Sequence, residues 1–457
     1  MNFDVLVLGS GPAGYYCALN CARLGKRTAL VEKDRLGGTG FRWGCLPVKM
    51  MLDRIRNAPG ADTPLSATSV ITETAGRIEA VETRIQRRLA GSGVTLIKGL
   101  GRFSDPGTFR VGKRSISASQ IVIATGTEPA GWPGVPLDGK RIISHREVLA
   151  LSRVPDHLLI LGGDVEGIEF ADLFSHLGTR VTVVEKEATI LPGMDRDLVE
   201  PLEARLIARG VRLITGAVVC GCSTDETAVR VDLDNGSHLI GDKVLATGLR
   251  RANLPEGLAE AGVDHDEQKI RVNGDLQTSR GNIYAAGDIN GITGMAHAAI
   301  QQALLVARRI TGGVDRPSAG RGTDKGGAAL PGPPYPRAVY TLTEIAGAGS
   351  QERELDAEGI PYRRRAYRIG DTWRGFSKGI DEGFVKILAG RDDRILGIWM
   401  CGGDASELAS LFGALVSKNL TVGELLHSLI LHPTLGEALL EAAMEIGQES
   451  GGTIRAQ

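Results

Sequence analysis

Apolar residues recur along the chain with two periods, that of strands and that of helices. The order of these strand and helix patterns predicts a repeated unit. The segment 3–33, FDVLVLGSGPAGYYCALNCARLGKRTALVEK, begins as a short apolar strand and passes through a glycine-rich turn into a helix with apolar positions three and four apart. It ends in a second apolar strand that carries Glu32. The segment 157–187 repeats this order and ends with Glu185. Both segments are typical of a βαβ unit, so we expect two nucleotide-binding halves.

The same two periods predict the elements between and beyond these units. The first part of the chain is expected to add a solvated helix over 76–93, a buried strand over 120–129, a strand over 281–291 that delivers Asp288 at its carboxyl end, and a helix over 295–310. The C-terminal part alternates strands over 383–390 and 395–402 with helices near 404–418 and 436–448, which favours an α+β module.

Composition and charge narrow the class of protein. A chain of 457 residues exceeds the size at which one hydrophobic core stops growing, so two or three domains are expected. A formal net charge of -1 gives no general attraction to nucleic acid or to an anionic membrane, and we predict neither partner. The sequence has no apolar run of about 18 residues and no signal-peptide pattern at its start, which favours a cytoplasmic protein. Six cysteines do not indicate a disulfide scaffold.

The first glycine loop, GSGPAG, is suited to a dinucleotide. Gly9, Gly11 and Gly14 follow a strand and precede a helix, and Glu32 ends the next strand. The glycines permit a tight turn, the close approach of backbone N–H groups to a pyrophosphate, and packing of the helix on the strand. The carboxylate accepts from ribose hydroxyls.

Six motifs in order give the chain a clear resemblance to a known family. GSGPAG, GGTGFRWGCLPVK, ATG, GIEF, NIYAAGDI and HPTLGE occur in the order and approximate spacing of the FAD-dependent pyridine nucleotide-disulfide oxidoreductases. The chain most resembles the dihydrolipoamide dehydrogenase branch of this family, with one redox cysteine missing. The resemblance covers nearly the whole chain. It implies an α/β fold with two Rossmann-like domains, of FAD and NAD(P) type, and a C-terminal α+β dimerisation domain.

The resemblance also implies domain boundaries and cofactor residues. We expect the FAD domain over 1–150 and 273–312, an inserted NAD(P)-type domain over 151–272, a linker over 313–334 and the dimerisation domain over 335–457. The residues implied to hold FAD are Gly9, Gly11, Pro12, Ala13, Gly14, Glu32, Lys33, Gly38, Thr39, Thr125, Gly126, Gly287 and Asp288. Lys49 and Glu169 are implied to lie near the reactive edge of the flavin, and no metal site is predicted.

One expected thiol is absent from the loop 37–49. Relatives carry Cys-x-x-x-x-Cys there, whereas this chain has Gly40 in the first position and Cys45 in the second. In the family the first thiol exchanges with the substrate, so a cycle between dithiol and internal disulfide is lost. Cys45 remains a candidate for a charge-transfer thiolate, a sulfenic acid or a mixed disulfide, and all three require a lowered thiol pKa. Alternatively, Cys45 only packs beneath the flavin.

The second glycine loop, GGDVEG, is altered where the fingerprint needs its middle glycine. Asp164 stands there, between Gly162 and Gly167, and Glu166 lies in the same turn. Like charges at about 4 Å cost roughly 4 kcal/mol at an effective dielectric constant near 20, or about a thousandfold in affinity. We therefore predict an intact fold with an occluded nicotinamide site, and expect both acidic side chains to accept from free N–H groups of the helix. Alternatively, the loop shifts and NADH binds, with Glu185 disfavouring NADPH.

The motif HPTLGE supplies His432 and Glu437. A carboxylate that orients an imidazole makes it a suitable base for a thiol proton near neutral pH. The resemblance implies that this pair reaches the flavin of the partner subunit in a homodimer. Relatives often carry a second histidine where this chain has Ile430, and Arg42 and Trp43 beside Cys45 are bulkier than the usual loop residues. Ile430 makes the mouth of the site more apolar and weakens the transfer of lipoamide specificity, and Arg42 and Trp43 indicate an unusual substrate.

Three functions follow from these features. The leading prediction is an FAD-dependent oxidoreductase acting on a small-molecule or carrier-bound thiol or other sulfur substrate, whose flavin is reoxidised by an acceptor other than NAD(P)+, such as O2. The second is an NADH-dependent reductase of the dihydrolipoamide dehydrogenase type that works with one cysteine. The third is a non-catalytic FAD-containing binding subunit.

Overall fold

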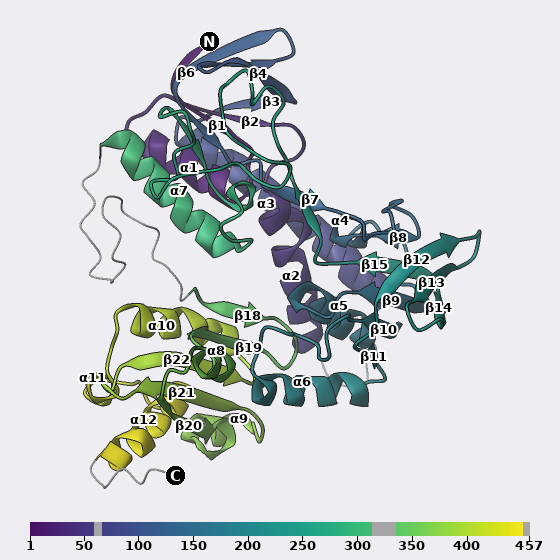
Figure 1. Ribbon diagram of the computed structural model, residues 1–457, viewed down its shortest axis with the longest axis vertical. Coiled ribbons are helices and arrows are strands. Elements are labelled where there is room, and N and C mark those ends of the chain that lie inside the picture. The colour runs from purple at the N-terminus through teal and green to yellow at the C-terminus, as the bar shows by residue number, and fades with distance from the viewer. Residues whose placement is uncertain (59–65, 313–334, 451–457) are drawn as a thin grey trace.

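The computed structural model describes residues 1–58, 66–312 and 335–450, and the expected linker over 313–334 lies outside them. Figure 1 shows a sheet with its helices near the N-terminus, a second sheet beside this part, and a C-terminal part at the opposite end of the molecule. The mixed α/β architecture predicted from the sequence is confirmed. No helix in the described ranges combines the length and the apolar character that crossing a membrane requires.

The first βαβ unit belongs to a 7-stranded sheet. Its strands are β1 (Asn2–Leu8), β2 (Thr28–Glu32), β3 (Thr95–Lys98), β4 (Gly101–Asp105), β5 (Thr108–Val111), β6 (Arg114–Ile123) and β17 (Ile283–Ala285). The order is β3-β2-β1-β6-β5-β4, with β17 paired to β6. β4 and β5 pair antiparallel, whereas β3, β2, β1, β6 and β17 pair parallel. The apolar run of β1 is buried because both faces of the sheet are covered.

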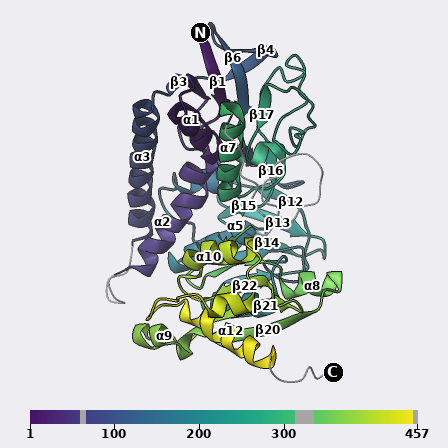
Figure 2. The same ribbon diagram turned by 90° about the vertical axis from the view of Figure 1, so that its left-hand side faces the viewer.

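Helices and turns complete this part of the chain. They are α1 (Pro12–Arg23), η1 (Thr39–Trp43), α2 (Cys45–Arg56), α3 (Ala67–Gly91), η2 (Asp288–Asn290) and α7 (Ala296–Thr311). α1 packs on α7, and α3 adds its apolar stripe to the same cluster. Figure 2 shows α1 and α7 side by side with α3 next to them. The helices expected over 76–93 and 295–310 are confirmed as the end of α3 and as α7.

The second βαβ unit forms a separate five-stranded sheet in the order β11-β10-β9-β15-β8. Its strands are β8 (Ile142–Ile143), β9 (His157–Leu161), β10 (Arg180–Val184), β11 (Arg212–Ile214) and β15 (Lys243–Ala246). The helices of this part are α4 (His145–Val148), α5 (Val165–His176) and α6 (Arg196–Ala208). A three-stranded sheet of β12 (Val219–Thr224), β13 (Val229–Leu233) and β14 (His238–Gly241) lies beside it, and β7 (Thr127–Pro129) pairs with β16 (Arg250–Ala252). The predicted internal repeat is therefore confirmed.

The C-terminal part is an antiparallel five-stranded sheet with helices, as the pattern predicted. Its strands are β18 (Arg337–Val339), β19 (Ile345–Gly349), β20 (Tyr362–Arg368), β21 (Phe384–Gly390) and β22 (Ile395–Cys401). Its helices and turns are α8 (Glu352–Glu358), η3 (Ile369–Asp371), α9 (Trp373–Lys378), α10 (Ala405–Ser417), α11 (Val422–Leu426) and α12 (Glu437–Ser450). α10 packs on β19 and β22, and α12 packs on β20 and β21.

A buried lysine ties the C-terminal sheet to the second βαβ unit. Lys386 of β21 is 0% exposed, and its Nζ donates to Asp195 at 2.9 Å, to Asp197 at 2.8 Å and to Glu352 at 2.7 Å. A buried cation requires such partners, and the three carboxylates are satisfied by it in turn. This contact fixes the start of α6 against the C-terminal sheet and so helps to hold the second βαβ unit in place.

Candidate active site

A cavity of about 430 Å³ lies at the carboxyl ends of the strands in the first sheet. Most residues predicted to hold FAD line it, namely Gly9, Gly11, Pro12, Ala13, Glu32, Lys33, Gly38, Thr39, Thr125, Gly126, Gly287 and Asp288. Cys45, Lys49 and Glu169 line the same cavity. Gly14 does not line the cavity, because it packs against the carbonyl group of Gly9. The structure therefore brings most of the predicted site residues together.

The glycines of the first loop have different physical roles. Gly9 has φ +96°, which favours glycine, and a Cβ on Gly14 would lie 1.9 Å from the Gly9 carbonyl oxygen. These two glycines are thus needed by the protein itself. A Cβ on Gly11 would instead meet nothing closer than Gly38 Cα at 4.0 Å. The space at Gly11 is not used by protein atoms, which agrees with a pyrophosphate approaching there.

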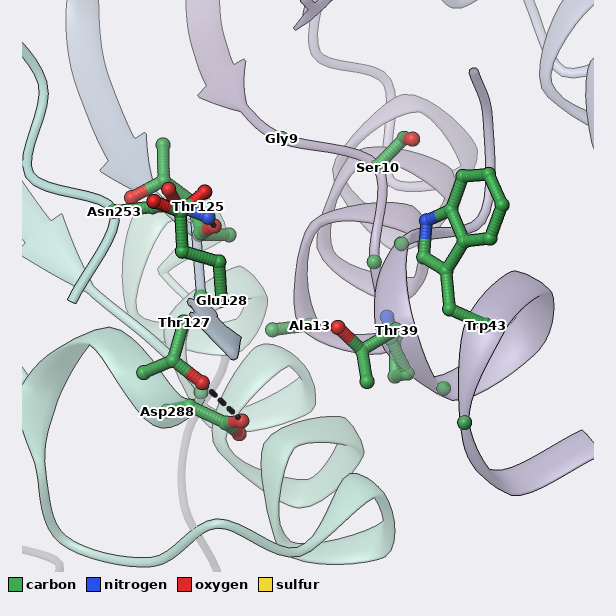
Figure 3. A pocket seen from close by; sticks show the side chains of 18 of the residues that line it. Gly9, Ser10, Ala13, Thr39, Trp43, Thr125, Thr127, Glu128, Asn253 and Asp288 are labelled. Atoms are coloured by element: carbon green, nitrogen blue, oxygen red, sulfur yellow. Dashed lines mark hydrogen bonds between the residues drawn. The ribbon is translucent and has the colours of Figure 1, made fainter. Parts of the chain in front are cut away.

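Polar groups around the cavity fit a dinucleotide. Glu32 accepts from the Ser10 N–H at 2.9 Å and from Ser10 Oγ at 2.6 Å, which places its carboxylate at the glycine loop. Thr127 Oγ1 donates to Asp288 Oδ2 at 3.2 Å, across from Ser10 and Trp43 (Figure 3). Thr125 Oγ1 is buried and has no partner among the described residues. Such an atom requires a partner, and a ligand in this cavity would supply one.

Lys49 and Glu169 form an ion pair in the cavity wall. Lys49 Nζ lies 2.5 Å from Glu169 Oε2 and 4.6 Å from the centre of the Tyr340 ring. The other oxygen of Glu169 accepts from the Tyr340 N–H at 2.9 Å. Burial lowers the pKa of Lys49, but the charge and hydrogen bond of Glu169, together with Cys45 and Tyr340, outweigh it and hold this pKa above its usual value. Burial raises the pKa of Glu169 despite the opposing effect of Lys49.

Cys45 begins α2 and is exposed to the cavity in this single chain. Removal from bulk water raises the pKa of its thiol, and Lys49 opposes this only in part. A redox role for Cys45 as a thiolate requires the opposite direction, whereas inert packing beneath the flavin does not. All six cysteines lie in described residues and form no disulfide, and of these Cys45 alone lines the cavity.

The second glycine loop keeps the backbone of the first. Gly162 has φ +101°, and a Cβ on Gly167 would lie 1.8 Å from the Gly162 carbonyl oxygen, as for Gly9 and Gly14. Asp164 has φ -84° and ψ -175°, close to the φ -64° and ψ -177° of Gly11. The prediction that Asp164 leaves the fold intact is confirmed. Glu185 accepts from the Gly163 N–H at 2.6 Å, in the same way as Glu32 in the first loop.

The two acidic side chains of this loop behave differently from each other. Asp164 is exposed and makes no hydrogen bond to the helix N–H groups, so its predicted capping role is wrong. Glu166 does not cap the helix either. Its Oε1 lies 2.7 Å from Nδ1 of buried His145, and its Oε2 accepts from the Gly248 N–H at 3.2 Å. The interaction with His145 comes from an element distant in sequence, which is why the local pattern does not reveal it.

Sequence reasoning missed several cavity residues. His145 was not singled out, although the sequence Ser-x-x-Glu over 144–147 forms a capping box that places it in the first turn of α4. Arg250 was also missed, and it donates to Thr127 and Thr39 beside the cavity. Trp43 lines the cavity with the guanidinium groups of Arg42 and Arg146 over its ring, at 4.8 Å and 5.1 Å.

His432 and Glu437 lie away from the cavity of their own chain. His432 Nδ1 is hydrogen-bonded to Glu437 Oε1 at the start of α12, and the His432 side chain is 66% exposed. Neither residue lines the cavity. The predicted contact between the two residues is confirmed, and the exposed imidazole is free to approach another molecule.

Comparison with known proteins agrees with this arrangement. The family model "pyridine nucleotide-disulphide oxidoreductase" matches residues 3–303, and the model of the dimerisation domain of that family matches residues 335–443. A dihydrolipoyl dehydrogenase of Bacillus subtilis is 32% identical, with 97% of this chain and 98% of that protein covered. Dihydrolipoyl dehydrogenase 3 of Pseudomonas aeruginosa is 30% identical, with 97% and 98% covered.

Solved structures give the same picture of the fold. LpdA from Mycobacterium tuberculosis has a TM-score of 0.86 and 27% identity, with 97% of this chain and 99% of that chain covered. The Cu(II) complex of RclA, an HOCl-induced flavoprotein disulfide reductase from Escherichia coli, has a TM-score of 0.86 and 22% identity, with 98% and 100% covered.

Proposed function

The chain belongs to the pyridine nucleotide-disulphide oxidoreductase family, and from that premise we propose that it oxidises a thiol or another sulfur-containing substrate with FAD and passes the electrons to an acceptor other than NAD(P)+. One observation carries the proposal. The cavity holds a single thiol, Cys45, and Gly40 occupies the position of the exchange thiol. A chain without that dithiol does not perform the usual internal disulfide cycle.

FAD is the expected cofactor of this family, and the residues of the cavity fit it. The loop from Gly9 to Gly14 would hold the pyrophosphate, Glu32 the ribose, and Thr125 and Asp288 further hydroxyl groups. The flavin would supply a two-electron acceptor. Lys49, kept protonated by Glu169, would place a positive charge at the reactive end of the cavity. The chain's own task is then to position the substrate and move its proton.

We assign the proton transfer to His432. Its Nδ1 is bound to Glu437, so in the neutral imidazole Nε2 is the atom that accepts a thiol proton, and the carboxylate stabilises the cation that forms. The match to the dimerisation domain supports a homodimer, in which an imidazole 66% exposed on one subunit would reach the cavity of the other. With O2 as acceptor the balanced reaction is 2 RSH + O2 → RSSR + H2O2.

The second candidate is an NADH-dependent reductase that works with Cys45 alone. Two observations favour it: the backbone of the second glycine loop is intact, and Glu185 points to that loop as Glu32 does to the first. The third candidate, a non-catalytic FAD-containing subunit, draws support from the raised pKa of the Cys45 thiol.

Anaerobic titration of the FAD-loaded dimer separates the three candidates. NADH, NADPH and dithiothreitol are added separately while the flavin absorbance band is followed, and air is then admitted. The proposal predicts bleaching by the dithiol alone, with recovery of the band and formation of H2O2 in air. Rapid bleaching by NADH would support the second candidate. Bleaching by no reductant, with no turnover that depends on His432 and with FAD and the dimer retained in His432→Ala, would support the third.

A further inference from the structure

Glu166, and not Asp164, is the acidic residue of the second glycine loop that lines the cavity. Four residues in the first two turns of α5 face the cavity, namely Val165, Glu166, Glu169 and Phe170. Their spacing of three and four residues places them along one side of the helix. This side leads from the glycine loop to the pair formed by Lys49 and Glu169, so Glu166 stands between the loop and the reactive end of the cavity.

The carboxylate of Glu166 is held from two directions. His145 Nδ1 lies 2.7 Å from Oε1, and the Gly248 N–H donates to Oε2 at 3.2 Å. Burial raises the pKa of Glu166, but the hydrogen bond and charge of His145, the Gly248 N–H and the charge of Arg250 together lower it below its usual value. Glu166 is therefore ionised at neutral pH and fixed in position.

Moving this carboxylate aside would strand a buried imidazole. His145 is 3% exposed, and its Nε2 has no hydrogen-bond partner among the described residues. If Glu166 rotated away, Nδ1 would lose its partner as well, and both ring nitrogens would be buried without one. A buried polar group without a partner is costly, so His145 keeps Glu166 in place.

A nicotinamide coenzyme would have to pass this carboxylate. In a Rossmann half, the pyrophosphate lies at the amino end of the helix after the glycine loop, which here is the start of α5. To reach Lys49, Glu169 and Cys45, the nicotinamide end would extend along the side of α5 that carries Val165 and Glu166. A ring stacked there would cover an ionised carboxylate and remove it from water, which opposes binding.

We propose that Glu166, held in place by His145, is the specificity-determining residue that keeps nicotinamide coenzymes from the reactive end of the cavity, and that Asp164 contributes less. This inference rests on the proposed function, since it names the residue responsible for the use of another acceptor. O2 is small enough to reach the flavin without covering this carboxylate. His145 is a positioning residue, because it acts through Glu166.

The test is the affinity for NADH, measured anaerobically by isothermal titration calorimetry on the FAD-loaded protein. Four variants are compared with the native chain: Glu166→Ile, Asp164→Gly, His145→Leu and the exposed control Glu200→Ile on α6. Glu166→Ile is expected to bind NADH at least tenfold more tightly than the native chain, whereas Asp164→Gly and Glu200→Ile change the affinity less than threefold. His145→Leu is expected to gain affinity as well, which a purely structural role would not produce.

Each outcome decides between the two claims. If the native chain binds NADH and its flavin is bleached, the proposed function fails. If the native chain excludes NADH and Asp164→Gly restores binding while Glu166→Ile does not, the inference is overturned and the proposed function stands. If the native chain excludes NADH and Glu166→Ile gains no affinity for it, the inference is also overturned. Flavin content and circular dichroism check folding, and Glu166→Gln, which removes the charge with little change of shape, replaces Glu166→Ile if that variant does not fold.

Discussion

Gly40 lies directly against the ring of Pro12. A Cβ built on Gly40 would come within 2.7 Å of Pro12 Cγ and 3.3 Å of Pro12 Cδ, and Ala296 Cβ would lie 3.7 Å away. Real Cβ atoms do not approach ring atoms this closely, so the loop or the proline would have to move. The segment around Gly40 therefore leaves no room for a side chain at this position without a shift of Pro12 or of the loop itself.

This contact predicts that Gly40→Cys does not restore a disulfide with Cys45. The added side chain should displace Pro12 and lower the FAD content of the purified protein. Thiol titration after air oxidation and denaturation should find seven free thiols, the six native ones and the introduced one. Gly76→Cys on α3, where a Cβ would meet nothing within 4 Å, is the matched control and should keep its FAD. Finding five thiols in Gly40→Cys, with full FAD content, would contradict the prediction.

The raised pKa of Cys45 predicts slow alkylation at neutral pH. Only the thiolate reacts with iodoacetamide, and the partial removal of the Cys45 sulfur from bulk water raises the pKa of its thiol above the ordinary 9.0. In the FAD-free protein, the rate at Cys45 should therefore still increase between pH 9 and pH 10. Mass spectrometry of peptides measures this rate relative to exposed Cys220 on β12. A rate at Cys45 that has levelled off by pH 8 would contradict the account.

Removing the charge of Lys49 should lower the free energy of unfolding, because Glu169 is then buried without a cation. Lys49→Met leaves a buried carboxylate without its cation, and breaking a buried pair in this way costs about 3–5 kcal/mol. The pKa of Glu169, already raised by burial, should rise further. A raised pKa means that stability is retained at acid pH and lost as the pH rises through that pKa.

Thermal unfolding between pH 5 and pH 8 tests this prediction for Lys49→Met. The loss of Tm relative to the native chain should grow as the pH increases. The double variant Lys49→Met with Glu169→Gln carries no buried charge at this place, so it should recover part of the loss and show a weaker pH dependence. An equal loss at every pH would show that packing, and not the charge of Glu169, is responsible.

Lys386, the buried lysine of β21, should contribute more to the free energy of unfolding than an exposed lysine does. Lys386→Met leaves Asp195, Asp197 and Glu352 facing one another, and we expect a loss of about 3–5 kcal/mol in the free energy of unfolding. Lys378→Met removes an exposed pair with Asp404 and should cost about 0–1 kcal/mol. Chemical denaturation of both variants at pH 7 gives the comparison. Similar losses in the two variants would contradict the role assigned to Lys386.

The contribution of Lys386 should also depend on pH. Carboxylates raise the pKa of Lys386 above its ordinary 10.5 despite burial, and Lys386 and Arg364 lower the pKa of Asp197 below its ordinary 3.8 despite burial. The stabilisation is thus fully present between about pH 4 and pH 10 and is lost outside this range. The difference in stability between the native chain and Lys386→Met should narrow at pH 3.

Local patterns predicted the fold well because each βαβ unit carries its own signals. The apolar strand, the glycine turn with Gly9 and Gly14, and the acidic residue at the end of β2 all act within about 30 residues. The second unit repeats these signals with Asp164 in place of a glycine, and its backbone is close to that of the first. Residues whose role depends on such a local unit were therefore predictable.

Interactions between distant elements were not predictable from these signals. His145 meets Glu166 across 21 positions, and Lys386 meets Asp195 across 191. Nor does the sequence show that Glu166 faces the cavity while Asp164 faces water, because that depends on where α5 packs. The pKa of Cys45 could not be predicted for the same reason, since the elements around the cavity remove its thiol from bulk water and this effect outweighs the neighbouring Lys49.

A crystal of the FAD-loaded protein soaked with NADH tests the central claim most directly. The claim is that acidic side chains at the second glycine loop keep the coenzyme from the reactive end of the cavity. Electron density should then show Glu166 still bound to His145, with no coenzyme along the side of α5. Density for NADH lying along α5, with its nicotinamide stacked on the flavin, would contradict the account.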